Sequence, residues 1–191
     1  MNLFFAPDKV VCPEFTLRSY DAGDGTLLKN AQDSSYEHLK KYMPWAQPEI
    51  SANEAENNVR KFRARYLLNE DFYIGIFSPD GKKLLGGTGF HLRNRPITEN
   101  VAEIGMWISE DCAGQGLGTK VLIEMLRWGF SEWQWVRLFW RCSSENIASA
   151  TVARKGGMIQ EAQLRNDHIS HLDGSRTDML YFSALKGEWQ A

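Results

Sequence analysis

The sequence predicts one α/β domain built on a mixed, mostly antiparallel sheet that is flanked by helices. The first half carries β-prone runs separated by turns, which is typical of an antiparallel meander. The middle passes from an apolar strand, 101–108, through a glycine turn, 112–118, into an amphipathic helix, 119–130. The second half alternates strands and helices. We therefore expect a parallel pairing where this central strand–glycine turn–helix unit crosses over.

The composition predicts a single domain over residues 1–191, with its core at about 15–185. Apolar residues make up 43% of the chain and charged residues 24%. A chain of 191 residues can bury a sizeable core without disulfides or structural metals. The net charge is −2 and the charges are interspersed, which argues against a nucleic-acid partner. No apolar run reaches spanning length, so we expect no membrane partner either.

The cysteines predict a reducing compartment. There are three of them, an odd number without C-x-x-C spacing, which disfavours a disulfide framework or a structural zinc. The N-terminus lacks the basic region and the long apolar core of a signal peptide. We therefore expect a cytoplasmic protein.

Capping residues and turns bound the elements of the first half. Ser51 followed by Glu54 makes a capping box, so we expect a helix from there to about residue 68. Pro44 and Pro48 end the segment before it. The other expected elements are a first strand, a loosely helical segment and a hairpin closed by Pro-Asp-Gly, at residues 15–18, 31–42, 72–77 and 84–92.

The second half is bounded in the same way. We expect a strand at 136–142, and then a short helix at 147–155 that Asn146 opens and a Gly-Gly pair ends. The last two strands are expected at 158–164 and 177–185, joined across an Asp-Gly turn.

The glycine turn predicts an anion site, because it places unpaired backbone N–H groups at a helix N-terminus. A dinucleotide fingerprint needs a glycine three residues after Gly116, where Thr119 stands. A Walker loop needs Gly-Lys-Ser/Thr, whereas residues 118–120 read Gly-Thr-Lys. Both nucleotide interpretations are disfavoured. A purely structural strand-to-helix corner and the pyrophosphate of coenzyme A remain as alternatives.

A resemblance favours coenzyme A. Gly116 and Gly118 match the Gln/Arg-x-x-Gly-x-Gly/Ala pattern of the GNAT superfamily of N-acetyltransferases, although Ala113 occupies the Gln/Arg position. A second block is similar to that of the RimJ/RimL-type branch and reads Asn146-x-x-Ser149-x-x-Val152-x-x-Lys155-x-Gly157-Met158. Further matches are Tyr42–Trp45, Ala102–Gly105, Arg176 with Asp178, and Leu180-Tyr181. Together the matches cover residues 15–185.

The resemblance implies a GNAT-type fold and an acetyl-CoA-dependent N-acetyltransferase that needs no metal. The backbone of residues 103–108 would bind the pantetheine arm as if it were an added strand, and backbone N–H groups would hold the pyrophosphate. The residues expected to bind acetyl-CoA are Ile108, Ala113, Gly114, Gln115, Gly116, Leu117, Gly118, Thr119 and Asn146. Capping of the following helix is the alternative role of Asn146.

Acetyl transfer to an amine needs a neutral amine, donors for the oxyanion and a proton for the departing thiolate. Glu103 is one candidate base, because it interrupts an apolar strand, although it is also consistent with simple alternation of strand faces. Glu161 is the other, since the resemblance places a glutamate there; the alternative is a surface carboxylate. Many family members carry a tyrosine acid where this chain has Ala153, so Ser149 is the candidate partner of the thiolate, or else a helix cap.

The resemblance implies direct attack in a ternary complex by the N-terminal α-amine of a protein, notably a ribosomal protein. Such an amine has a pKa of about 7.7–8.0, so a weak base suffices. Cys142 is better described as a buried inert thiol than as an acyl carrier. The resemblance also implies a homodimer.

Two other functions stay open. A small-molecule amine such as a polyamine, an aminoglycoside or an amino acid is one alternative acceptor. A polycation would favour a concentrated acidic pocket, and the candidate glutamates Glu54, Glu56, Glu99, Glu103 and Glu161 form no obvious cluster in the sequence. The second alternative is a catalytically silent acyl-CoA-binding module. The missing tyrosine acid and the alanine at position 113 motivate it.

Overall fold

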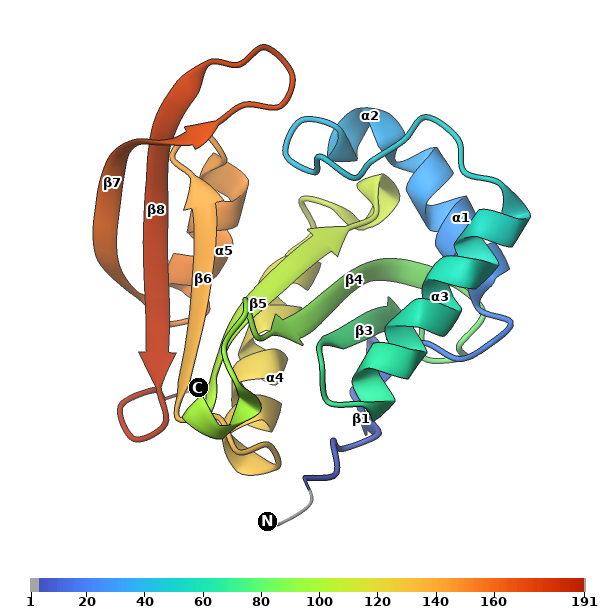
Figure 1. The fold of residues 1–191 in the computed structure, drawn as a ribbon, viewed down its shortest axis with the longest axis horizontal. Coiled ribbons are helices and arrows are strands. Elements are labelled where there is room, and N and C mark those ends of the chain that lie inside the picture. The colour runs from blue at the N-terminus through green and yellow to red at the C-terminus, as the bar shows by residue number, and fades with distance from the viewer. Residues whose placement is uncertain (1–3, 191) are drawn as a thin grey trace.

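The computed structural model describes residues 4–190, which form an eight-stranded sheet with helices on both faces (Figure 1). The strand order is β1-β2-β3-β4-β5-β6-β8-β7, and every neighbouring pair is antiparallel except β5 and β6. The mixed, mostly antiparallel sheet with one crossover is therefore confirmed. The strands are β1 (Lys9–Val11), β2 (Thr16–Ser19), β3 (Phe72–Phe77), β4 (Leu84–His91), β5 (Val101–Ile108), β6 (Arg137–Ser143), β7 (Ile159–Ile169) and β8 (Arg176–Leu185).

The helices also follow the capping signals. Ser51 Oγ accepts a hydrogen bond of 3.1 Å from the N–H of Glu54, and Asn146 Oδ1 accepts one of 3.0 Å from the N–H of Ser149. Both residues are thus N-caps, as predicted. The helices are α1 (Gly25–Ser34), α2 (Tyr36–Leu39), α3 (Ala52–Leu67), α4 (Leu117–Ser131) and α5 (Ile147–Lys155), with short 3₁₀ turns η1 (Ile97–Glu99) and η2 (Glu110–Cys112).

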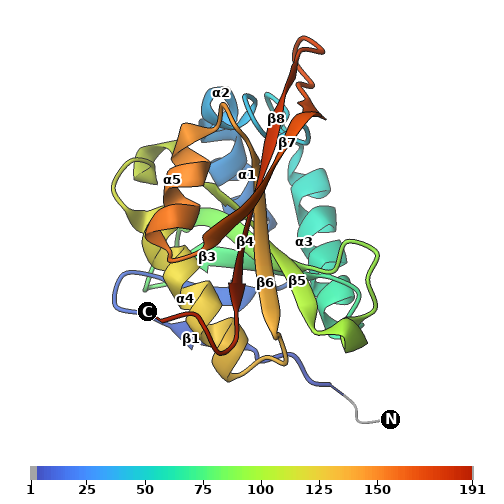
Figure 2. The ribbon, with the colours of Figure 1, turned by 90° about the vertical axis from the view of Figure 1, so that its left-hand side faces the viewer.

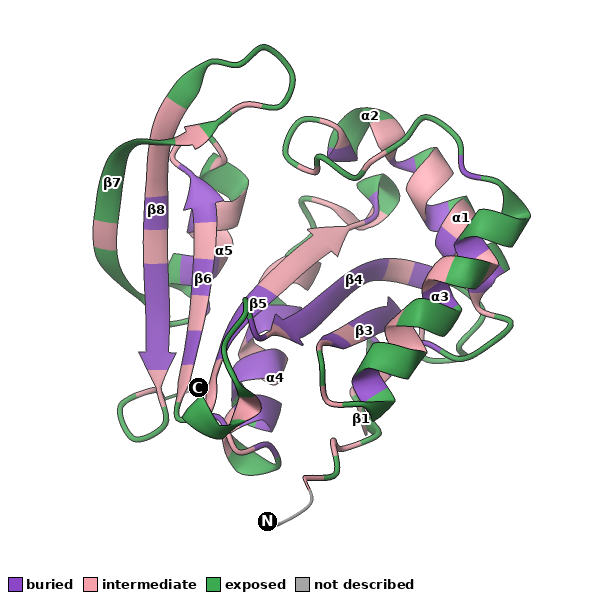
Figure 3. Cartoon of the chain, in the orientation of Figure 1, coloured by how far each residue is buried: buried purple, intermediate pink, exposed green. Residues whose placement is uncertain are grey.

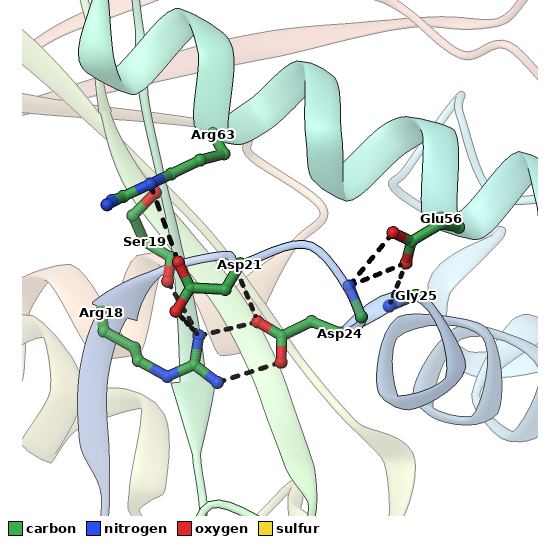
Figure 4. Close-up of polar contacts among 8 residues, drawn as sticks. Arg18, Ser19, Asp21, Asp24, Gly25, Glu56 and Arg63 are labelled. Carbon is green, nitrogen blue, oxygen red and sulfur yellow. Dashed lines mark hydrogen bonds and ion pairs between the residues drawn. The ribbon is translucent and has the colours of Figure 1, made fainter.

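Helix α1 begins well before the predicted helical segment, because a neighbouring helix holds its N-terminus (Figure 4). The Glu56 carboxylate of α3 accepts hydrogen bonds from the N–H of Gly23 at 3.1 Å and of Gly25 at 3.3 Å. Arg18 binds the neighbouring Asp24 through two hydrogen bonds of 2.7 and 3.0 Å. A Cβ at Gly25 would lie 2.6 Å from the Glu56 Cα, so the glycine lets α1 pack directly on α3. These long-range contacts leave no local signal in the sequence.

The sheet separates two helical layers (Figure 2). Helices α1 and α3 pack over the strands of the first half, and α4 and α5 pack on the opposite face. The apolar face predicted for α4 is buried against β5 and β6: Val121, Leu122, Met125 and Leu126 are all inaccessible to solvent. No helix in the described range 4–190 combines the length and the apolar character of a membrane span.

Strands β5 and β6 separate after a short parallel ladder, as Figure 1 shows. The ladder joins Val101–Glu103 to Arg137–Phe139. Beyond Glu103, β5 stays paired with β4, and β6 stays paired with β8. The two halves of the sheet therefore open like a V, and no helix of the described chain lies in front of β6 and β8 in the view of Figure 3.

Candidate active site

The opening between β5 and β6 holds a cleft of about 720 Å³. The second half of β5, from Ile104 to Trp107, lines one wall, and Trp140–Ser143 of β6 line the other. One face of α1 and of α3 and the start of α5 add further lining residues. The unpaired backbone of β5 on this side can accept an extended ligand as an added strand.

The glycine turn follows directly from the β5 wall. Gly114 and Gly116 have positive φ angles of +74° and +83°, which L side chains rarely adopt, and a Cβ on either would point into open space. Helix α4 begins at Leu117 without a side-chain cap. The backbone N–H groups from Gly114 to Thr119 donate no hydrogen bond to any described residue. This row of free donors at a helix N-terminus fits the pyrophosphate of a nucleotide-bearing ligand.

Two of the residues expected to bind acetyl-CoA, Ile108 and Ala113, precede the free donors of this turn. Ile108 ends β5, and its side chain would lie 3.7 Å from a Cβ on Gly118. Ala113 is different from its neighbours, because its N–H donates to the Glu110 carbonyl at 3.2 Å and is already used. The donor set thus begins at Gly114. The alanine at position 113 leaves the donors after it unaffected.

Ser149 lies on the cleft wall at the first turn of α5. Its Oγ accepts a hydrogen bond of 2.9 Å from the indole Nε1 of Trp140. Since the oxygen accepts from the indole, the hydroxyl can use its own proton as a donor, and the sulfur of Cys142 is one acceptor within its reach. Asn146 caps the helix and also lines the cleft, so its two alternative roles are compatible. Trp140 thus positions Ser149 through a contact between β6 and α5 that no local sequence pattern indicates.

Cys142 also lines the cleft but is 7% exposed. Burial raises the pKa of its thiol, and a hydrogen bond with Ser149 opposes this shift only in part. A thiol with a raised pKa is a poor nucleophile at neutral pH. The expectation that Cys142 is inert is therefore consistent with its environment.

Glu103 reaches the cleft floor, where two arginines engage it. Its Oε2 accepts hydrogen bonds from Arg93 Nε at 2.8 Å and from Arg141 Nη2 at 2.7 Å. The Glu103 side chain is 7% exposed, while both guanidinium groups reach solvent. To take a proton from an amine, this carboxylate would have to give up charge-assisted hydrogen bonds. Its surroundings fit an ion-pair anchor across three strands better than a base.

Glu161 lies outside the cleft. Its carboxylate accepts hydrogen bonds from Arg137, which starts β6 far from the open end of the V, and from Ser183 Oγ at 2.7 Å. The Arg137 and Ser183 bonds lower the pKa of this carboxyl to about 2. Because Glu161 lies on β7 at the opposite end of β6 from Ser143, the structure does not bring it to the other candidates. The base role expected for Glu161 has no geometric support.

His91 is a further ionisable group on the cleft floor, and no sequence motif indicates it. His91 ends β4 and is the register partner of Glu103. Its Nδ1 is 3.0 Å from Oδ1 of Asp71, and Nε2 makes no hydrogen bond within residues 4–190. Burial acts to raise the pKa of Asp71, but the interactions with His91, a hydrogen bond from Tyr73 and the charge of Arg93 together outweigh it and lower that pKa. An Asp separated from a His by twenty residues is no recognisable motif, so only the β3–β4 register reveals the pair.

Aromatic side chains line the outer end of the cleft, and hydrogen bonds join the segments on either side of it. Trp45 packs on Trp107 with ring centroids 5.9 Å apart, and Tyr42 donates a hydrogen bond of 3.2 Å to the Glu145 carbonyl. Both residues belong to the Tyr42–Trp45 segment that matches the family, and both line the cleft. His171, at the β7–β8 hairpin, lies 2.7 Å from the Lys40 carbonyl and joins the hairpin to the α2 region.

The charges lining the cleft are balanced. They comprise two carboxylates, two guanidinium groups and two imidazoles: Glu54, Glu103, Arg93, Arg141, His91 and His168. The other glutamates considered above, Glu56, Glu99 and Glu161, do not line it. Within residues 4–190, no three His, Cys, Asp or Glu side chains gather in a metal-binding arrangement.

Comparisons with known proteins agree with this geometry. A YdaF protein of Bacillus subtilis (strain 168), whose name provisionally assigns it as a ribosomal N-acetyltransferase, is 26% identical over 92% of this chain and 93% of its own. Among solved structures, RimL, a ribosomal L7/L12 α-N-protein acetyltransferase in complex with coenzyme A, superposes with a TM-score of 0.81 at 20% identity, over 92% of this chain and 96% of its own.

A third protein shares the fold but is named for a different role, self-immunity. The microcin C7 self-immunity acetyltransferase MccE, in complex with acetyl-CoA and AMP, superposes with a TM-score of 0.78 at 18% identity, over 91% of this chain and 93% of its own. The family described as the acetyltransferase (GNAT) domain matches residues 14–159, which is most of the chain. The open V, the free donors at the start of α4 and this match together place the chain in the GNAT family of N-acetyltransferases.

Proposed function

We propose that this enzyme transfers the acetyl group of acetyl-CoA to the N-terminal α-amine of a protein, of the kind modified by ribosomal-protein acetyltransferases. Acetyl-CoA would lie with its pyrophosphate on the N–H groups of Gly114–Thr119 and its pantetheine arm along the open edge of β5. The thioester would then face Ser149 and the cleft floor. The names of YdaF and RimL support an acceptor of this class.

The charge balance of the cleft is the observation that carries the choice of acceptor. A polyamine or an aminoglycoside carries several positive charges, and a site for it needs carboxylates in excess. Here Glu103 is engaged by Arg93 and Arg141, which leaves Glu54 as the one unpaired carboxylate on the described cleft wall. A single α-amine followed by a peptide chain suits this balance, because it brings one charge that is readily lost near neutral pH.

Direct transfer in a ternary complex fits the thiols of the cleft wall and of the turn before Gly114. An acyl-enzyme route requires a thiolate, and burial raises the pKa of Cys142. Cys112, in the turn before Gly114, also has a raised pKa, again chiefly because of burial. The amine would therefore attack the thioester carbon itself, and the Ser149 hydroxyl would donate to the departing thiolate.

An acceptor panel tests this proposal. Purified enzyme, acetyl-CoA and a thiol reagent would be combined with peptides bearing free N-termini, the same peptides with blocked N-termini, spermidine and an aminoglycoside. We expect thiol release with free N-terminal peptides and none with the blocked forms, with mass spectrometry placing the acetyl group on the α-nitrogen. Preferred turnover of spermidine or the aminoglycoside would reject the acceptor class. Tight coenzyme A binding without turnover of any amine would instead favour a silent binding module.

A further inference from the structure

We propose that His91, held by Asp71, is the general base that removes the proton of the acceptor amine. The inference rests on the proposed amine acetylation but not on which amine is used. His91 stands at the end of β4, on the cleft floor, directly beside the β5 segment where the sheet begins to open.

The two ring nitrogens of His91 have different surroundings. Nδ1 is bonded to the Asp71 carboxylate at 3.0 Å, and this pair is largely shielded, with side-chain exposures of 12% and 18%. A carboxylate acceptor fixes the neutral tautomer with the proton on Nδ1. Nε2 then carries the lone pair. It has no described hydrogen-bond partner and is not among the atoms sealed from solvent. The dyad thus presents a basic nitrogen to the cleft.

Glycines on two strands make room for the imidazole. A Cβ on Gly105 would lie 3.0 Å from both Nε2 and Cδ2 of His91, and a Cβ on Gly89 would lie 3.1 Å from Nε2. The outer edge of the ring therefore occupies the space that side chains on these two residues would fill. Tyr73 packs edge-on against it from β3, with centroids 5.2 Å apart. This packing fixes the ring beside Gly105, on the β5 segment that faces the opening.

The other ionisable groups near the ring are already engaged. Glu103 binds two guanidinium groups, and the hydroxyl of Tyr73 accepts a hydrogen bond of 3.5 Å from Arg65. The groups that face the ring or its carboxylate from the surrounding elements are Asp71, Tyr73, Arg93 and Glu103, with Arg65 and Arg141 behind them.

The proposed step conserves protons and charge. Nε2 takes one proton from the acceptor ammonium, and the neutral nitrogen attacks the thioester carbon to form a C–N bond. The tetrahedral intermediate collapses, and the C–S bond breaks. The nitrogen's extra proton goes to the departing sulfur by way of the Ser149 hydroxyl, and the proton on His91 passes to solvent. The products are the amide and coenzyme A.

The test compares His91→Gln with His38→Gln, a matched change at an exposed histidine of α2, and with His168→Gln on the far cleft wall. We expect His91→Gln to lower kcat by about 10²-fold, the lower end of the range for general-base catalysis. The coenzyme A affinity should stay within a few-fold. His38→Gln should match the wild type. Asp71→Asn should lower kcat by about 10-fold, since it removes the partner that orients the ring.

Three readouts separate a base from a structural residue. The acidic limb of the wild-type pH profile of kcat/KM should disappear in His91→Gln. Added imidazole should restore activity to His91→Ala. Methoxyamine is a weakly basic acceptor that is already neutral at the assay pH. Its turnover should fall far less in His91→Gln than the turnover of an ordinary amine. Gly105→Ala, which presses on the ring without touching the dyad's hydrogen bond, keeps the test open should His91→Gln fail to fold.

The outcomes are distinct for the two proposals. The kcat of each variant is compared with that of the wild type on whichever amine the wild type accepts. A wrong acceptor class would therefore leave this inference standing. Retention of kcat and of the acidic limb in His91→Gln would overturn the base assignment. An equal loss with methoxyamine, or a loss confined to His168→Gln, would overturn it too.

Discussion

The indole N–H of Trp140 donates a hydrogen bond of 2.9 Å to the hydroxyl oxygen of Ser149, and this contact joins β6 to α5 at the wall of the cleft. The indole can only donate, so the Ser149 hydroxyl keeps its proton for donation to a sulfur, whether that of Cys142 or that of a departing thiolate. A fixed serine hydroxyl that still has a proton to give is what a departing thiolate requires.

Ser149→Ala should therefore lower kcat by about 10²-fold while leaving coenzyme A affinity within a few-fold. Trp140→Phe keeps an aromatic ring and removes the donor. It should lower kcat only several-fold, because the hydroxyl remains but is no longer oriented. Thiol-release kinetics and calorimetric titration of coenzyme A would measure both. Thr151→Ala is the matched control on α5, since its hydroxyl only donates to the Ile147 carbonyl. Full activity in Ser149→Ala would reject the acid role.

Gly116→Val should abolish coenzyme A binding, because a side chain at this position would stand where the phosphates approach the N–H donors. The substitution also strains the backbone, since φ is +83°. Gly81→Val controls for that strain: Gly81 has a φ of +71° in the β3–β4 turn, and a Cβ there also meets open space. Both variants should lose similar thermal stability, and only Gly116→Val should lose the ligand. Retained binding in Gly116→Val would contradict the placement of the pyrophosphate.

The fold was largely predictable because its signals are local. The β3 and β5 strands and the α5 helix begin and end as expected, since turns and caps such as Asn146 lie next to them in the chain. Strand β1 was missed because three residues at a sheet edge carry no readable alternation. Strand β7 was expected to end at 164 but continues to Ile169, with the left-handed Asn166 taken up in an irregularity of its pairing with β8.

The site was only partly predictable because its decisive contacts are between distant segments. The glycine turn and Ser149 belong to contiguous motifs; Ser149 lines the cleft, and the turn follows the strand that forms one cleft wall. The Asp71–His91 pair and the Trp140–Ser149 bond form only when strands and helices pack. Glu161 shows the converse: the family resemblance places a glutamate at its position, but its carboxylate lies with Arg137 outside the cleft.

Glu103→Gln should destabilise the fold by about 1–2 kcal/mol, because two arginines lose a shared anionic acceptor in a largely buried position. The loss stays moderate since both guanidinium groups reach water. Glu99→Gln is the matched control: its carboxylate binds Arg95 at 2.7 Å with both side chains well exposed, so its change should be about 0–1 kcal/mol. Urea denaturation would measure both. Equal stabilities for the two variants would show that the Glu103 ion pairs contribute nothing beyond a surface pair.

Glu161→Gln should change the pH dependence of stability and leave kcat alone. The folded-state pKa of this carboxyl is about 2, against 4.5 for a free glutamate, so the native protein prefers the ionised form. The resulting stabilisation is fully present above pH 4.5 and is lost as the pH falls towards 2. The wild type should therefore exceed Glu161→Gln in urea midpoint at pH 6, and the gap should narrow at pH 3.

Arg137→Gln should reproduce the stability loss at pH 6, because it removes the main partner that stabilises the charge. Turnover at pH 7 in Glu161→Gln should equal that of the wild type, since the carboxylate does not line the cleft. A large fall in kcat with an intact fold would mean that Glu161 reaches the acceptor amine after all. The assignment of the base to His91 would then lose the support that it draws from the exclusion of Glu161.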